Sequence, residues 1–118
     1  MELENNLINI AIKYYDSILD KNFTFVEKVL HSDAQLISPL GNYSDKQSII
    51  TAAKKLSESL DTILIESKLS NENQVMLAYN FLFSKPELNL RAAVLMDFQN
   101  NKIKRIELFY DSKPFSEK

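Results

Sequence analysis

The chain has no cysteine and no tryptophan, and only one histidine and one glycine among its 118 residues. Without cysteine it forms neither a disulfide nor a thiolate nucleophile. Zinc prefers sulfur and nitrogen ligands, so a single histidine without cysteine argues against a structural zinc site. We therefore expect neither a metal site nor a bound cofactor.

The sequence also lacks an excess of charge and any long apolar run. Its 14 basic and 16 acidic residues give a formal net charge of −2. The basic run Lys102–Arg105 is too short to follow a phosphate backbone. No apolar run approaches the roughly 20 residues that span a bilayer, and the acidic start Met1–Asn6 is unlike a signal peptide. We predict a cytoplasmic protein that binds neither nucleic acid nor a membrane.

Helical spacing dominates the first half of the chain. Apolar residues recur at this spacing from Leu3 to Leu19. Thr24–Glu27 has the spacing of a capping box, which predicts a short helix that ends near Leu30. Ser44–Gln47 repeats that spacing and predicts a third helix from Asp45 to about Leu60.

A period of two replaces the helical spacing beyond Asp61. Four segments rich in β-branched and aromatic residues are predicted strands: Thr62–Leu69, Gln74–Ser84, Leu88–Phe98 and Lys102–Tyr110. The short polar turns between them favour antiparallel hairpins. Helices followed by a meander predict one α+β domain over residues 1–118, with the helices on one face of a curved sheet.

The segment His31–Gly41 holds the only histidine and the only glycine, between two predicted helices. It is typical of a helix end, a short strand Ala34–Ile37 and a sharp corner at Pro39–Gly41. Ser38 precedes the corner, where serine either satisfies the backbone of a turn or donates a hydrogen bond to a ligand. Nucleophilic catalysis by Ser38 needs a base in reach, and His31 is expected at the helix end, where it interacts well with the helix dipole.

This order of elements resembles the nuclear transport factor 2-like superfamily, specifically its small SnoaL-like members, which include ketosteroid isomerases and polyketide cyclases. The resemblance rests on Tyr14 in the first helix, on Asp33-Ala34 before the Pro39–Gly41 corner, and on the closing strand Ile106–Asp111. It implies a cystatin-like, cone-shaped antiparallel sheet curved around three N-terminal helices. It also implies an apolar pocket that opens between the sheet and the helices.

Resemblance to the isomerases implies three polar positions in that pocket. Tyr14 occupies the position of a tyrosine that donates to a developing oxyanion. Ser38 stands where the isomerases have an aspartate base directly before the corner proline. Val94 stands where they have a protonated acid on the penultimate strand, and Asp97 lies on the other face by strand parity. Steroid isomerisation by the familial mechanism is therefore not expected.

We predict that the chain binds a small apolar molecule without the familial catalysis. The pocket candidates are Tyr14, His31, Ile37, Ser38, Leu56, Val94, Met96 and Leu108. One alternative is an isomerase, cyclase or hydratase that uses another acid or His31 as its base. A second alternative is a structural or protein-interaction module in which side chains fill the pocket. An open cavity would favour the first two hypotheses over the third.

The predicted strands also indicate an apolar outer face. Tyr79, Phe81 and Phe83 alternate with Ala78, Asn80 and Leu82, so whichever set faces inward, the other leaves apolar area outside. Such a face is usually covered by a partner, and a homodimer through it is the simplest arrangement. On the next strand, an alternating and wholly apolar set is expected to face the interior: Ala92, Val94, Met96 and Phe98.

Overall fold

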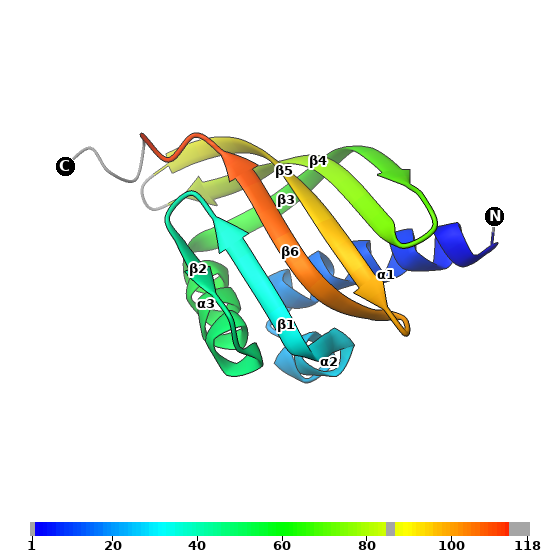
Figure 1. Ribbon diagram of the computed structural model, residues 1–118. Coiled ribbons are helices and arrows are strands. Elements are labelled where there is room, and N and C mark those ends of the chain that lie inside the picture. The colour runs from blue at the N-terminus through cyan, green and yellow to red at the C-terminus, as the bar shows by residue number, and fades with distance from the viewer. Residues whose placement is uncertain (1, 85–86, 114–118) are drawn as a thin grey trace.

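The computed structural model describes residues 2–84 and 87–113, with side chains from residue 6 onward. Three helices lie on one side of a curved sheet (Figure 1): α1 (Glu2–Leu19), α2 (Phe23–Val29) and α3 (Lys46–Ser59). The sheet has six strands: β1 (Leu30–Ser38), β2 (Gly41–Tyr43), β3 (Leu60–Ser70), β4 (Gln74–Ser84), β5 (Glu87–Gln99) and β6 (Lys102–Tyr110). No helix among the described residues is long and apolar enough to cross a membrane.

The strand order is β2-β1-β6-β5-β4-β3. Strands β3 to β6 form the predicted antiparallel meander, and the α+β class is confirmed. Strand β1 pairs with β6 in parallel, so the sheet is mixed. The short strand β2 pairs with β1 around the Pro39–Gly41 corner. The local sequence pattern indicates neither pairing, because β2 is too short for a period and β1 meets β6 from far along the chain.

Two helices begin at residues other than the predicted caps. Helix α2 follows Asn22, whose side chain accepts a hydrogen bond from the Phe25 N–H at 3.3 Å. Lys21 has a positive φ of 59° and ends helix α1, which leaves Asn22 in place to cap the next helix. Before α3, the Asp45 carboxylate accepts from the Ser48 N–H at 2.8 Å. The capping boxes predicted at Thr24–Glu27 and Ser44–Gln47 are therefore wrong.

The core lies between the inner face of the sheet and the helices. The predicted interior set of β5 is confirmed, because Ala92, Val94, Met96 and Phe98 are all buried. On β4 it is Tyr79 and its alternating neighbours that face inward, which resolves the parity left open by the sequence. Burial of these side chains removes apolar surface from water and drives folding.

The N-cap assignment of helix α3 predicts the stability of two neighbouring variants. Asp45→Ala removes an acceptor for a backbone N–H and a negative charge near the positive end of the helix. We expect it to lower the free energy of unfolding by about 1 kcal/mol, whereas Ser44→Ala changes it by a few tenths. Urea denaturation of both variants checks this, and equal losses would contradict the assignment.

Candidate functional site

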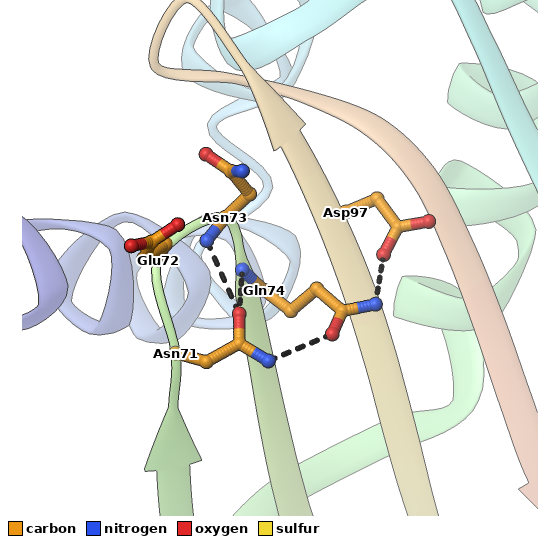
Figure 2. Close-up of a pocket in the computed structure, with 5 residues that line it drawn as sticks. All are labelled: Asn71, Glu72, Asn73, Gln74 and Asp97. Atoms are coloured by element: carbon orange, nitrogen blue, oxygen red, sulfur yellow. Dashed lines mark hydrogen bonds between the residues drawn. The ribbon is translucent and has the colours of Figure 1, made fainter.

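A polar hollow lies at the β3–β4 turn and is lined by Asn71, Glu72, Asn73, Gln74 and Asp97 (Figure 2). The Asn71 side-chain oxygen accepts from the N–H groups of Asn73 and Gln74 at 3.1 and 3.0 Å, and its amide donates to the Gln74 side chain at 2.8 Å. Gln74 in turn donates to Asp97 at 2.8 Å. These hydrogen bonds hold the turn against β5, so we assign the hollow a structural role.

A second, mostly apolar cavity of about 370 Å³ opens between α1, α3 and the inner face of the sheet. This volume lies near the lower end of the range of about 300–1,000 Å³ that is typical of ligand pockets. Its inner wall consists of buried residues: Tyr14, Tyr15, Ile18, Leu36, Ile49, Ala53, Phe81, Leu90 and Ile106. Half-buried residues follow: Ser38, Ala52, Leu56, Phe83, Leu108 and Tyr110. The mouth consists of exposed residues: Leu40, Tyr43, Lys55 and Ser59.

Four of the eight candidate residues line this cavity: Tyr14, Ser38, Leu56 and Leu108. Ile37 points to the outer face of the sheet, because it pairs with Glu107 while its neighbours Leu36 and Ser38 face the cavity. Val94 and Met96 are fully buried in the core and do not line the cavity. Parity on β1 and the extent of the core on β5 therefore divide the candidate set.

His31 lies in strand β1, beyond the end of α2, and it does not line the cavity. Its Nδ1 atom accepts a hydrogen bond from the Asp33 N–H at 3.0 Å, a local contact within the strand. In the described part of the chain, histidine and acidic side chains form no group of three or more that could hold a metal ion.

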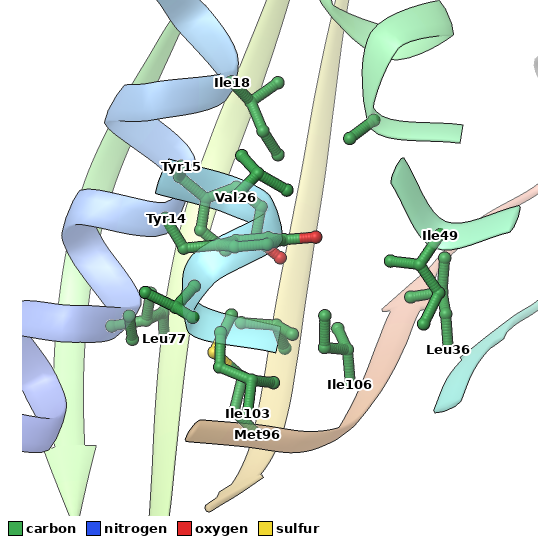
Figure 3. Close-up of a cluster of buried hydrophobic side chains, with 14 of the residues drawn as sticks. Tyr14, Tyr15, Ile18, Val26, Leu36, Ile49, Leu77, Met96, Ile103 and Ile106 are labelled. Atoms are coloured by element: carbon green, nitrogen blue, oxygen red, sulfur yellow. The ribbon is translucent and has the colours of Figure 1, made fainter. Parts of the chain in front are cut away.

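Two tyrosines of α1 carry hydroxyl groups into the interior. The Tyr79 hydroxyl donates to the Tyr15 hydroxyl at 2.8 Å, and the rings of Tyr14 and Tyr15 meet edge to face at 5.1 Å. In Figure 3 the Tyr14 ring points from α1 towards the side on which Ile49 and Ile106 lie. Burial raises the pKa of Tyr14, Tyr15 and Tyr79 above the ordinary tyrosine value. These hydroxyls are therefore neutral donors at physiological pH and not bases.

Ser38 occupies the rim of the cavity at the β1–β2 corner. Its hydroxyl donates to the Gly41 carbonyl at 2.8 Å and so closes the corner. It also forms a hydrogen bond with Tyr110, whose pKa is raised by burial and lowered in part by this bond. The described residues that line the cavity include no carboxylate and no histidine. Ser38 thus has neither an acid nor a histidine beside it among the described lining residues.

Several lining residues lie outside the predicted set: Tyr15, Leu40, Tyr43, Lys55, Phe81, Phe83 and Tyr110. Phe81 and Phe83 belong to the inward set of β4, which alternation alone leaves as one of two choices. Tyr43 comes from strand β2, for which the sequence carries no periodic signal. Lys55 lies beside the apolar stripe of α3, and the sequence pattern indicates only a solvent-exposed lysine at this position.

No protein-family model and no curated protein matches the sequence. Solved structures do match. A nuclear transport factor 2-like protein of unknown function from Cytophaga hutchinsonii is 15% identical with a TM-score of 0.82, over 94% of this chain and 95% of its own. The chain has the nuclear transport factor 2-like fold.

Two other structures extend the likeness to this fold. A candidate SnoaL-like polyketide cyclase from Jannaschia sp. CCS1 is 10% identical with a TM-score of 0.82, over 98% of this chain and 92% of its own. A candidate ketosteroid isomerase from Kribbella flavida is 12% identical with a TM-score of 0.80, over 98% and 90%. At these identities the nuclear transport factor 2-like fold is shown, and it confirms the predicted architecture. One fold hosts many functions, so the residues of the site, and not the fold, decide the function.

The buried hydroxyls predict how stability depends on alkaline pH. Unfolded tyrosine has a pKa near 10, and burial raises the folded values of Tyr15 and Tyr79. Their contribution to stability is therefore complete below about pH 10 and falls as the pH rises further. Above about pH 10 the free energy of unfolding should fall less steeply with pH in the double variant Tyr15→Phe/Tyr79→Phe. The difference in slope should correspond to about two fewer protons released on unfolding. Urea denaturation at several alkaline pH values measures this slope.

The native protein provides an independent reading of the same effect. Tyrosinate absorbance from the buried residues should rise together with the loss of the far-ultraviolet circular dichroism signal, because these tyrosines ionise only on unfolding. A gradual rise in their absorbance while the native signal persists would contradict the burial of the hydroxyls.

Proposed function

We propose that the chain binds a small, mainly apolar molecule in the cavity between α1, α3 and the sheet. The observation that carries this proposal is an open cavity of about 370 Å³ whose inner wall is almost wholly aliphatic and aromatic. The transfer of apolar ligand surface from water to such a wall is favourable. The Tyr14 hydroxyl lies on this wall and provides a neutral donor that can orient a ligand carbonyl or hydroxyl. An open cavity speaks against the hypothesis of a pocket filled by side chains.

The proposed binding takes place without the familial acid–base reaction. A proton shuttle needs a group that accepts and returns a proton near physiological pH. The resemblance implies an aspartate at the position of Ser38, and the described lining residues include no acid and no histidine. In an isomerase, cyclase or hydratase reaction, the substrate itself or a bound water would therefore have to act as the base. This makes enzymatic activity the weaker of the two proposals.

Cavity-filling variants test the binding proposal with the neutral fluorescent probe N-phenylnaphthylamine. Leu56→Trp and Leu108→Trp add bulk to two half-buried positions of the cavity and should weaken probe binding at least tenfold. Ile37→Trp adds the same ring on the outer face and should leave binding unchanged. Fluorescence titration measures the three affinities, with circular dichroism to establish folding. Equal binding by folded cavity variants and by Ile37→Trp would refute the proposal.

We also propose that a second copy of the chain covers the outer face of the sheet. Strand register brings Leu69, Met76 and Leu95 into one apolar row across three strands. Met76 and Leu69 are 37% and 67% exposed, although they are large apolar side chains. Farther along the same face, beyond Ala78 and Ala93, Arg91 pairs with Glu66 at 3.1 Å. A patch with apolar side chains and both signs of charge can complement itself across a two-fold axis.

A charge placed in the apolar row should dissociate the proposed dimer. Met76→Glu buries two unpaired carboxylates per dimer, one from each copy, and desolvation of such charges is unfavourable. Leu40→Glu is the matched control, because Leu40 is 57% exposed but lies at the cavity mouth. Analytical ultracentrifugation should give a dimer for the native chain and for Leu40→Glu, and a monomer for Met76→Glu. A monomeric native chain at micromolar concentration would exclude the dimer.

A further inference from the structure

Lys55 is the one charged residue among the described residues that line the cavity. It belongs to the exposed mouth, together with Tyr43 and Ser59. Within the described residues Lys55 forms no ion pair and no side-chain hydrogen bond, although Glu58 follows three residues later on the same helix. Its ammonium group is therefore available to a bound molecule.

Other basic side chains already have contacts within the protein. Lys21 donates to the Ser57 carbonyl at 2.8 Å and joins the ends of α1 and α3. Lys54, the neighbour of Lys55, lies over the Phe23 ring at 5.7 Å from its centroid. Arg105 reaches Glu107 at 3.2 Å on the outer face of the sheet. In contrast to these residues, Lys55 lines the mouth of the cavity and has no side-chain partner among the described residues.

The cavity is polarised from its inner wall to its mouth. The inner wall, around Ile18, Ile49 and Phe81, is buried and apolar, whereas the mouth is exposed and carries a cation beside hydroxyl groups. A ligand with the same polarity would place its apolar body inside and its polar head at the mouth. Because the described lining residues include no carboxylate, the Lys55 ammonium group favours a head of negative charge.

We propose that the preferred ligand class is a small amphipathic anion, with an apolar body and one carboxylate or similar head that pairs with Lys55. This proposal rests on the binding function proposed above and adds the charge of the ligand to it. Tyr43 and Ser59 supply hydroxyl donors at the same mouth, which can complete the hydrogen bonds of a carboxylate. A cationic ligand would meet the Lys55 ammonium group with no carboxylate among the described lining residues to offset it.

Matched competitors test the proposal, with displacement of N-phenylnaphthylamine as the readout. Decanoate, decanol and decyltrimethylammonium share one apolar chain and differ in the charge of the head. In Lys55→Met the affinity ratio of decanoate to decanol should fall about five- to tenfold from the native value. Lys55→Arg keeps the charge and should retain most of the native ratio. Lys54→Met, one residue away but facing Phe23, should leave the ratio unchanged.

The outcomes separate this proposal from the binding function. A fall in the ratio that is specific to Lys55→Met, smaller at high salt, supports the proposal. An unchanged ratio in Lys55→Met, or an equal fall in Lys54→Met, overturns the ligand charge while probe binding still supports the cavity. Native protein that prefers decyltrimethylammonium to decanoate also overturns it. Failure of the probe itself to bind refutes the binding function and this inference with it.

Discussion

The buried hydrogen bond between the Tyr15 and Tyr79 hydroxyls anchors helix α1 to the sheet across 64 residues of chain. Both residues are buried, so each hydroxyl depends on the other for a polar partner. The rings of the two residues also meet edge to face, with centroids 5.0 Å apart. This contact sets where α1 rests on the inner face. A second link, from Lys21 to the Ser57 carbonyl, ties the end of α1 to α3.

The cavity follows from how these helices cover a curved sheet. One part of the inner face, around Leu77 and Met96, is filled completely by apolar side chains. The other part, around Phe83 and Leu108, lies beneath α3 and remains open. The boundary runs between Leu108, which lines the cavity, and its β5 partner Val94, which is fully buried. Packing of whole elements thus decides which apolar residues become core and which become cavity wall.

The chemistry of the cavity is set by which titratable groups reach it. Among the described lining residues, the polar groups are neutral hydroxyls and the Lys55 ammonium group. Aspartates and glutamates are present elsewhere, and several are used in contacts of the outer face, such as Glu66 with Arg91. The groups that line the cavity suit the proposed binding function better than the alternative of an acid–base enzyme. The fold alone would not distinguish these functions.

Much of the secondary structure could be predicted from short-range pattern. Strands β4 and β6 have the predicted bounds, because alternation and polar turns delimit them locally. The helix starts were predicted less well, since Asn22 and Asp45 competed with Thr24 and Ser44 as caps. Propensity does not separate adjacent capping residues. Only the path of the chain, such as the left-handed turn at Lys21, selects between them.

The sequence by itself determined that Ser38 directly precedes the corner proline, that the strands alternate, and that the fold is of the α+β class. Tertiary structure decided that Ile37 faces outward, that Phe81 faces inward, and that Lys55 stands at the mouth of a cavity. The physical reason is the distance along the chain over which each kind of interaction acts. Periodicity and capping act over a few residues, whereas a cavity exists only where segments distant in the chain are packed together. The charge that the cavity presents to a ligand is a property of that packing.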